Sequence, residues 1–425
     1  MNDFIIVNAR IITLDEGEIP RRGEQMADLG IIEHGFVLVR EGNIDQVDSG
    51  SPDQSVLDKS EELVVIDAEG RVVMPTFVDC HTHSCWEGSR LDEFEASLLG
   101  ANYLELLAQG GGIMSTVKAV REASQEELAT TLVGRVALMA SLGTTVVEVK
   151  SGYGLTTKDE LKMLRAIHDA SQEIPQLISG TFLGAHAIDP TIENFTSLVI
   201  EETLPAVVNE FPNITCDAYC EEGAWSVKET TKLFERAVEL GCPIRAHVDQ
   251  FNALGMLTNA IELGAVSVDH LEHSTDKELA LLAKSKTIAV LLPASGFCLG
   301  DAYARGRTMI DMGCAVAIAT NFNPGSAPTP SMPFAIALAC RRAGLSPAEA
   351  ITASTVNAAC VLGLEDRVGR IKVGFRGDIQ LLDCEDEREL AWKICGGGPL
   401  LVSIAGEIVH LLSENDNLIG EDDEE

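Results

Sequence analysis

Short apolar runs alternate along most of the chain with longer stretches in which apolar positions recur every three or four residues. Runs of this kind are typical of strands that are buried on both faces of a parallel sheet. Eight of them follow one another: Val72–Asp79, Thr144–Lys150, Leu177–His186, Thr215–Glu221, Pro243–His247, Ala265–His270, Thr287–Pro293 and Cys314–Thr320. The stretches with a helical period include Asp159–Glu173, Ser226–Leu240, Ala253–Leu263 and Thr275–Lys284.

Eight strand–helix units in succession most simply close into a barrel, so we predict an α/β fold of the (β/α)8 TIM barrel type. The chain of 425 residues is long enough, because such a barrel takes about 250 residues. A doubly wound open sheet is the alternative, since it also alternates parallel strands with helices.

Both ends of the chain depart from this alternation. Before the barrel, short strands are predicted at Asp3–Ala9, Gly35–Arg40 and Leu63–Asp67. After it come two helices, Met332–Ala343 and Pro347–Leu362, and then strands at Asp378–Asp383, Leu400–Ile404 and Glu407–Leu412. We therefore expect a small β-sandwich domain built from both termini, residues 1–73 and 371–413, with the barrel at 74–370 between them. Residues 414–425 are expected to form an acidic, disordered tail.

Composition narrows the class of protein. The formal net charge of −35 disfavours binding to nucleic acid or to an anionic membrane. No apolar run reaches the roughly eighteen residues of a spanning helix, and the N-terminus lacks the features of a signal peptide. Eleven irregularly spaced cysteines do not suggest a disulfide framework. We expect a cytoplasmic enzyme without a nucleic-acid or membrane partner.

Histidines gather where the predicted strands end. His81 and His83 follow the first strand, and residues two apart in a strand project to the same side. His186, His247 and His270 end the third, fifth and sixth strands, so five of the nine histidines fall at strand ends. Because the carboxyl ends of barrel strands form one face, where active sites lie, we predict a metal site there.

Other polar or special residues have a structural alternative. Glu221 ends the fourth strand and is expected to face the substrate, although it could instead cap a loop. Cys80 is expected to point away from the histidine pair. Gly110-Gly111-Gly112 is expected to end a helix; a phosphate cradle is the weaker interpretation because no Lys-Ser/Thr follows. Surface or core positions are expected for the remaining histidines, which are His34, His168, His273 and His410.

Longer motifs between Val72 and Gly377 resemble those of the imidazolonepropionase family, within the metal-dependent amidohydrolase superfamily. They comprise His81-Thr82-His83 with Gly88-Ser89-Arg90, the segments Gly110–Val117, Glu148–Leu155 and Phe182–Ala187, then Ala246–Gln250, Asp269–Glu272 and Asn323–Ser326. The paired histidines are typical of the whole superfamily. The Lys-Ser-Gly-Tyr-Gly-Leu and Asn-Pro-Gly segments are narrower and favour this family.

The resemblance implies hydrolysis of 4-imidazolone-5-propanoate to N-formimidoyl-L-glutamate by water activated on one zinc or iron ion. A single ion is favoured because the fourth strand ends in glutamate and not in a bridging lysine. The implied metal ligands are His81, His83, His247 and Asn321. Arg90 would bind the propionate, a task that suits the forked guanidinium. The other implied substrate contacts are Tyr153, His186, Gln250, Asn323, Gly325 and Ser326, and the implied catalytic residues are His270, Gln250 and Asn321. The partners would be a small-molecule substrate and a second copy of the chain in a homodimer.

Asn321 departs from the family pattern, which has aspartate at this position. An amide oxygen can still bind a metal, but it is neutral and cannot accept a proton as a carboxylate does. Loss of a positioned base typically lowers a rate by about 10²–10⁴-fold. The asparagine could be an engineered change, a natural one with His270 or another acid as the base, or the mark of a relative that has lost hydrolysis.

Two other functions therefore stay open. The chain could be a different cyclic-amide hydrolase or a deaminase of the superfamily, in which case activity would survive loss of Arg90. It could also be a non-catalytic homologue that binds the metal and a ligand without turnover.

Overall fold

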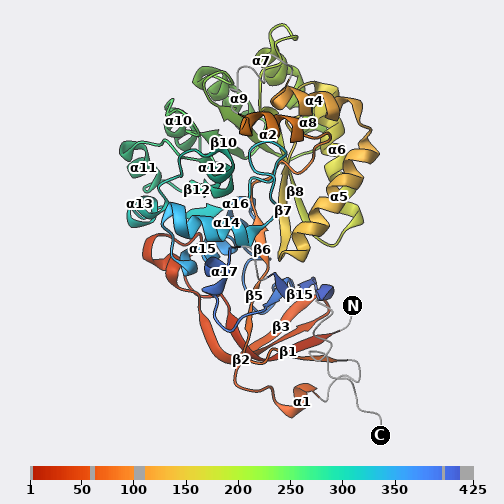
Figure 1. Ribbon diagram of the computed structural model, residues 1–425, viewed down its shortest axis with the longest axis vertical. Coiled ribbons are helices and arrows are strands. Elements are labelled where there is room, and N and C mark those ends of the chain that lie inside the picture. The colour runs from red at the N-terminus through yellow and green to blue at the C-terminus, as the bar shows by residue number, and fades with distance from the viewer. Residues whose placement is uncertain (1–2, 58–62, 100–110, 395–397, 412–425) are drawn as a thin grey trace.

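The computed structural model describes residues 3–57, 63–99, 111–394 and 398–411. They form a barrel surrounded by helices and, at its lower end in Figure 1, a second body of antiparallel and parallel strands. Gly110 and the predicted acidic tail at 414–425 lie outside the described residues. No helix among the described residues is long and apolar enough to cross a membrane.

Eight parallel strands form the barrel sheet, each beside its neighbour in chain order. They are β6 (Phe77–Asp79), β7 (Thr144–Lys150), β8 (Leu177–Ala185), β9 (Thr215–Cys220), β10 (Ile244–Val248), β11 (Ser267–His270), β12 (Ile288–Leu291) and β13 (Val316–Ile318). Backbone bonds just beyond the first and last strands link the two edges: Asn321 N–H donates to His81 O at 3.1 Å, and His83 N–H donates to Phe322 O at 2.9 Å. The fold is therefore a TIM barrel, as predicted, and not an open sheet.

The first predicted strand, Val72–Asp79, is divided in two. Residues Val72–Pro75 form β5, which pairs with strands of the second body, whereas Phe77–Asp79 forms β6 of the barrel. Thr76 lies at the junction, and its N–H donates to Asp378 O at 3.1 Å. The prediction of one strand was wrong because both halves are buried. An apolar run indicates that a strand is buried, but it does not indicate with which strand it pairs.

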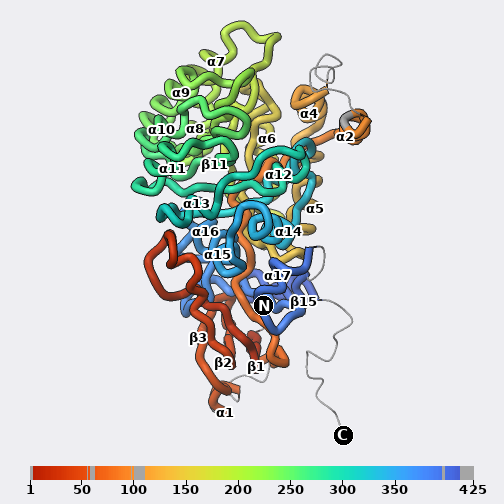
Figure 2. Tube along the Cα trace, turned by 60° about the vertical axis from the view of Figure 1, so that its left-hand side comes forward, coloured from red at the N-terminus to blue at the C-terminus, as the bar shows by residue number. Residues whose placement is uncertain are grey.

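Helices cover the outside of the barrel (Figures 1 and 2). Their bounds are α2 (Leu91–Leu98), α4 (Ile113–Glu122), α5 (Gln125–Ser141), α6 (Thr157–Glu173), α7 (Phe195–Leu198), η2 (Val199–Thr203), α8 (Leu204–Glu210), α9 (Val227–Glu239), α10 (Met256–Glu262), α11 (Asp276–Leu282), α12 (Pro293–Leu299), α13 (Gly306–Asp311), α14 (Met332–Leu338), η3 (Ala339–Ala343), α15 (Pro347–Ala353) and α16 (Val356–Leu362). Capping boxes, in which Ser or Thr precedes Glu by three residues, start α5, α9, α11 and α15. The predicted helix Pro347–Leu362 is two helices, interrupted at Ser354–Thr355.

The second body is one curved sheet made from both ends of the described chain. Its order is β16-β15-β14-β5-β1-β2-β3, and β4 also pairs with β1. The bounds are β1 (Phe4–Ile12), β2 (Ile31–Arg40), β3 (Asn43–Ser49), β4 (Val64–Asp67), β5 (Val72–Pro75), β14 (Ile379–Leu382), β15 (Pro399–Ile404) and β16 (Glu407–Leu411), with η1 (Gly23–Ala27), α1 (Gln54–Leu57) and α17 (Glu389–Trp392) beside them. The molecule is thus a TIM barrel with a small β-sandwich domain from both termini. Residues of opposite parity, such as Ile5 and Ile6, lie in separate apolar clusters.

Candidate metal centre and substrate site

Three histidines meet at the carboxyl ends of β6 and β10. His81 and His83 follow β6, His247 lies in β10, and ligand atoms of the three imidazoles are all within 4.8 Å of one another. They are buried, with 0%, 3% and 2% of their surface exposed. Nε2 of His83 and Nε2 of His247 are 3.4 Å apart. Two nitrogens bound tetrahedrally at roughly 2.0–2.1 Å to one ion would lie about 3.4 Å apart, so this pair has the spacing of two ligands of one metal.

Two of these imidazoles are held from behind by carboxylates. Nδ1 of His81 is 2.6 Å from Oδ2 of Asp269, and Nδ1 of His247 is 3.1 Å from Oδ1 of Asp217. A carboxylate that accepts from Nδ1–H fixes the ring and leaves Nε2 free as a ligand atom, the usual arrangement behind metal-binding histidines.

The remaining donor atoms also fit a metal ion. No described residue hydrogen-bonds to Nε2 of His81 or to Oδ1 of Asn321, although both atoms are buried. A buried polar atom without a partner is costly, and a cation between these atoms would satisfy them. Asn321 stands beside His81, to whose carbonyl its N–H donates. Three neutral nitrogens and an oxygen make a suitable site for a divalent metal ion.

Burial keeps these imidazoles neutral. It lowers the pKa of His81 and of His83 well below the ordinary value, and the nearby Lys150 and His186 add to the effect. Burial also lowers the pKa of His247, although Asp217 opposes it. Neutral imidazole is the form that binds metal, so the site needs no deprotonation of these rings at neutral pH.

His186, Tyr153 and His270 surround the three histidines. The ring of His186 stacks on that of His83 at a centroid distance of 4.8 Å, and the Tyr153 ring is 5.2 Å from His186. The His270 ring is 5.6 Å from that of His247 and 6.1 Å from that of His81. All five histidines that the sequence places at strand ends therefore converge.

Arg90 approaches the loop that follows β13. A Cβ atom placed on Gly325 would lie 3.5 Å from Nη1 of Arg90 and 3.5 Å from Oδ1 of Asn323. Arg90 pairs with Glu93 at 2.5 Å and donates to Thr116 Oγ1 at 3.3 Å. Its Nε is buried and has no partner among the described residues. Arg90 thus retains a free donor in this corner of the site.

Asn323 organises its own loop. Its Oδ1 accepts from the backbone N–H of Gly325 at 2.8 Å and of Ser326 at 2.7 Å, while Nδ2 donates to Asn321 O at 2.6 Å and to Ser326 Oγ at 3.0 Å. These bonds hold Asn321, Gly325 and Ser326 in one turn. Gln250 stands just beyond β10 and is 9% exposed.

Glu221 holds a loop instead of facing the site. Its Oε2 accepts from the backbone N–H of Phe251 and of Asn252, at 2.9 and 3.2 Å, and its Oε1 accepts from Asn252 Nδ2 at 2.8 Å. The expectation of a substrate-facing role was wrong, and the capping alternative describes the residue. The loop that it fixes begins directly after Gln250.

Cys80 and the glycine run have structural surroundings. Cys80 packs with Val78 and Val146 in an apolar cluster, on the opposite side from His81 as parity predicted. Gly112 has a φ of +72° and directly precedes α4. The prediction that the glycine run ends a helix concerns residues 100–110, which lie outside the described residues. Of the histidines not expected in the site, His34, His168 and His273 are exposed and His410 is half-buried.

Sequence reasoning gave no role to several residues around the histidines, although some of them lie in the quoted motifs. Tyr219 of β9 is the register partner of His247, with the rings 6.0 Å apart, and Glu272 lies 3.2 Å from Nδ1 of His270. Five charged side chains also lie inside the barrel below the site: Glu148, Lys150, Asp217, Arg245 and Asp269. The signal was present, because in β7 the charged Glu148 and Lys150 alternate with valines that pack in the core.

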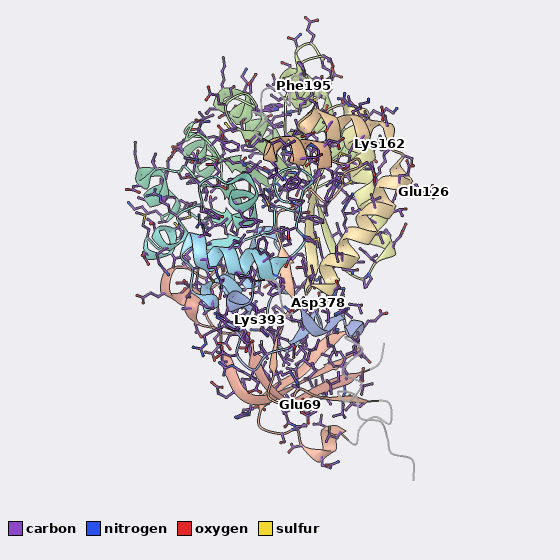
Figure 3. All side chains as sticks on the ribbon, viewed as in Figure 1. Glu69, Glu126, Lys162, Phe195, Asp378 and Lys393 are labelled. Atoms are coloured by element: carbon purple, nitrogen blue, oxygen red, sulfur yellow. The ribbon has the colours of Figure 1, made fainter. Side chains whose placement is uncertain are left out.

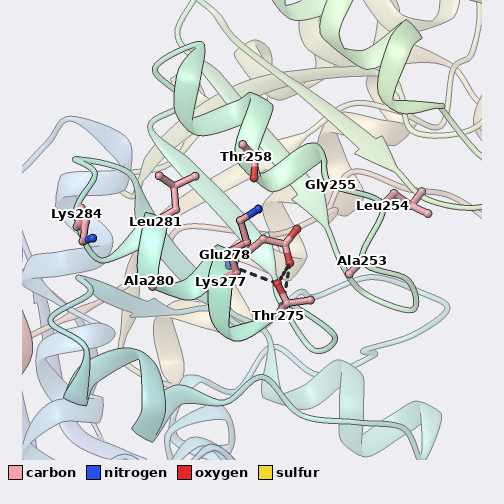
Figure 4. A pocket seen from close by; sticks show the side chains of 10 residues that line it. All are labelled: Ala253, Leu254, Gly255, Thr258, Thr275, Lys277, Glu278, Ala280, Leu281 and Lys284. Atoms are coloured by element: carbon pink, nitrogen blue, oxygen red, sulfur yellow. Dashed lines mark hydrogen bonds between the residues drawn. The ribbon is translucent and has the colours of Figure 1, made fainter.

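A groove on the outside of the barrel lies apart from these groups. It runs between α10 and α11 and is lined by residues from Ala253 to Lys284 (Figure 4). Two of its polar side chains are engaged with each other, since Thr275 Oγ1 donates to Glu278 Oε2 at 2.6 Å. None of the predicted site residues lines this groove, so it adds nothing to the metal centre.

The chain is similar in sequence to members of one enzyme family. The profile of the amidohydrolase family matches residues 72–409. An imidazolonepropionase of Symbiobacterium thermophilum is 46% identical over 391 residues, which are 89% of this chain and 91% of the relative. An imidazolonepropionase of Herpetosiphon aurantiacus is 43% identical over 96% of this chain and 97% of its own length.

Solved structures show the same fold at low identity. A 5-methylcytosine deaminase from Klebsiella pneumoniae superposes with a TM-score of 0.72 at 16% identity, covering 96% of this chain and 98% of the other. An E. coli guanine deaminase superposes with a TM-score of 0.69 at 14% identity, covering 97% and 100%. These likenesses support the barrel and its attached sheet.

Proposed function

Because the chain belongs to the amidohydrolase family and, within it, to the imidazolonepropionases, we propose that it hydrolyses 4-imidazolone-5-propanoate to N-formimidoyl-L-glutamate. It is a metal-dependent hydrolase of C–N bonds in cyclic amides, and the specific substrate is the proposal. One observation carries this proposal. The guanidinium of Arg90 lies beside the loop after β13, at the same end of the barrel as the three histidines.

Arg90 suits the propionate of this substrate. The guanidinium has a buried Nε–H without a partner among the described residues, and it lies against Gly325, where no side chain takes up the space. A carboxylate can accept two parallel bonds from such a group. The charged end of the substrate would thus be held at the loop after β13.

His186 and Tyr153 suit the flat imidazolone ring. Nδ1 of His186 is 3.1 Å from Gly152 O, so Nδ1 carries the proton and Nε2 is an acceptor. Burial lowers the pKa of His186 to about 3, which keeps the ring in this neutral form. Nε2 can then accept from a ring N–H of the substrate, while Tyr153 closes the apolar side.

Proton transfer falls to His270 in this chain. His81, His83, His247 and Asn321 would hold the metal ion, which would supply Lewis acidity for the lactam carbonyl and for water. Asn321 has no proton-accepting group, but Nδ1 of His270 lies 3.2 Å from Oε1 of Glu272. With Nδ1–H donating to Glu272, Nε2 of His270 can take a proton from water and return it to the leaving ring nitrogen.

A turnover assay tests the proposal. Loss of imidazolonepropionate absorbance is measured for the metal-loaded protein and for the variants Arg90→Ala and Asn321→Asp. We expect turnover by the unmodified chain, KM raised at least tenfold by Arg90→Ala, and kcat raised about 10²-fold by Asn321→Asp, since a positioned base is worth about 10²–10⁴. Metal-loaded protein that converts no substrate, with either Asn or Asp at 321, would overturn the proposed reaction.

The remaining assignments extend the same proposal. We propose one zinc or iron ion, held by His81, His83, His247 and Asn321, in a cytoplasmic homodimer. The domain boundaries at 1–73, 74–370 and 371–413 likewise stay predictions from the sequence. Metal analysis of the purified protein tests the identity and number of the ions, and the mass of the protein in solution tests the homodimer.

A further inference from the structure

A group of charged residues lies inside the barrel, below the three histidines. Glu148 and Lys150 come from β7, Asp217 from β9, Arg245 from β10 and Asp269 from β11, and at most 1% of each is exposed. Burying a charge is expensive unless it is paired, so such a group is retained only where every member has a partner. None of the five takes part in the proton transfers proposed above.

One row of contacts runs from Glu148 to His247. Nζ of Lys150 is 2.6 Å from Oε1 of Glu148 and 2.8 Å from Oδ2 of Asp217. The other oxygen of Asp217 is 3.1 Å from Nδ1 of His247. The position of the His247 ring thus depends on a carboxylate that Lys150 holds.

A second row runs from the same carboxylate to His81. Nη1 of Arg245 is 3.3 Å from Oε1 of Glu148, and Nη2 is 2.7 Å from Oδ2 of Asp269. That oxygen is 2.6 Å from Nδ1 of His81. Ser267 completes the row, because its Oγ accepts from Arg245 Nε at 2.8 Å and donates to Asp269 Oδ1 at 2.6 Å.

Glu148 also touches the residue between the two paired histidines. Its Oε2 accepts from the backbone N–H of Thr82 at 3.1 Å, and its backbone carbonyl accepts from Thr82 Oγ1 at 2.6 Å. Glu148 is therefore the point at which the supports of His81 and His247 meet, and it also holds the backbone between His81 and His83.

The five buried residues also carry a net formal charge. Three carboxylates face two cations, which leaves one excess negative charge next to the site. Burial disfavours the charged form of Arg245, but Asp269 and Glu148 outweigh this and raise its pKa. All four predicted ligands are neutral, because position 321 is asparagine.

We propose that Glu148 is a positioning residue for the metal ion: it joins the two rows of contacts and provides the negative charge that Asn321 does not. Carboxylates behind metal-binding histidines increase their basicity, and loss of such partners costs about 10–100-fold in metal affinity. The inference rests on the metal site of the proposed function and not on the identity of the substrate.

The test is the affinity of the purified protein for Zn²⁺, measured by competition with a chelator. Glu148→Gln keeps the shape but removes the charge, and it should weaken Zn²⁺ binding at least tenfold and change the absorption spectrum of the Co²⁺-substituted protein. The matched control is Glu349→Gln, which removes a buried glutamate that pairs with Arg307 at 2.9 Å, far along the chain in α15. The control should leave Zn²⁺ affinity within twofold.

A double variant separates charge from geometry. Glu148→Gln/Lys150→Met removes one charge of each sign and restores the excess negative charge, so it should bind Zn²⁺ more tightly than Glu148→Gln alone. Should Glu148→Gln fail to fold, Glu148→Asp decides, since it keeps the charge but draws the carboxylate back from Lys150 and Arg245, and it should weaken Zn²⁺ binding threefold or more.

Unchanged Zn²⁺ affinity in folded Glu148→Gln or, where that variant does not fold, in Glu148→Asp would overturn the inference. A purely structural role would lower the melting temperature of Glu148→Gln and of Glu349→Gln alike without a change in affinity. Failure of the proposed hydrolysis would appear differently, as absent turnover by protein that binds metal with full affinity.

Discussion

Three residues that end barrel strands adopt a left-handed backbone. Asp249, His270 and Asn321 have φ angles of +57°, +84° and +56°. This region is uncommon for residues other than glycine and costs on the order of 1–3 kcal/mol, although asparagine, aspartate and histidine adopt it more often than other residues do. Such conformations persist where the surrounding contacts determine the backbone, here where each strand turns sharply at the metal centre. Two of the three, His270 and Asn321, are residues of the proposed chemistry.

Glu93 pairs with Arg90 and would compete with the propionate of the proposed substrate. Its Oε2 is 2.5 Å from Nη2 of Arg90, and both side chains are mostly buried. We expect Glu93→Gln to lower KM for imidazolonepropionate about three- to tenfold with little change in kcat, because the guanidinium then lacks an internal anion. Steady-state kinetics measure both. Glu95→Gln, an exposed change on the same helix, is the control; a rise of KM in Glu93→Gln would instead make the carboxylate a support of Arg90.

At the scale of elements, the loop between β7 and α6 is held by the helix that follows it. Glu160 of α6 accepts from the backbone N–H of Gly154 and Leu155 through Oε1, at 2.9 and 2.8 Å, and from Gly152 through Oε2, at 3.0 Å. Burial raises the pKa of Glu160, although these hydrogen bonds oppose the shift. The loop carries Tyr153 to His186, so the helix positions a residue that we propose as a substrate contact.

Replacing Glu160 by Gln should loosen this loop. The amide –NH₂ would face backbone N–H groups, and each buried donor left unsatisfied costs about 1–3 kcal/mol. We expect KM to rise about tenfold and hydrogen exchange at Gly152 and Gly154 to become faster. Thr275→Ala removes the cap of α11 instead and should cost about 1 kcal/mol of stability with KM unchanged. Equal effects of both variants on KM would contradict the assignment.

At the scale of the molecule, the barrel and the sheet share a buried polar junction. Asp378, labelled in Figure 3, accepts from Thr145 Oγ1 of β7 at 3.2 Å and from the N–H of Ala405 at 2.8 Å. Gln380 of β14 donates to Pro75 O at 3.0 Å. The chain passes directly from β5 to β6 through this junction. The contacts of the small domain therefore help to fix the position of β6, the strand that His81 and His83 follow.

Asp378 should make stability depend on pH. Burial raises its pKa above the ordinary value near 3.8. Between that value and the raised one the folded protein binds more protons than the unfolded chain, so stability falls as pH rises through this window. Asp378→Asn should make the urea midpoint less dependent on pH as pH rises above 3.8. Asp386, whose pKa Arg388 lowers to about 2, has the opposite shift outside this range, so Asp386→Asn should leave the slope unchanged. A steeper slope in Asp378→Asn would contradict the expectation.

The sequence alone determined the barrel and the gathering of histidines. The strand predicted at Thr144–Lys150 matches β7 residue for residue, since a buried parallel strand needs an uninterrupted apolar run. His81, His83, His186, His247 and His270 could be placed together because all parallel strands end on one face. The tertiary structure alone decided which partner each group finds: that Val72–Asp79 serves two sheets, that Glu221 caps a loop, and that Glu148 links two histidine supports. Hydrogen-bond partners depend on which strands become neighbours when the sheet closes. The pattern of hydrophobic residues does not specify these neighbours.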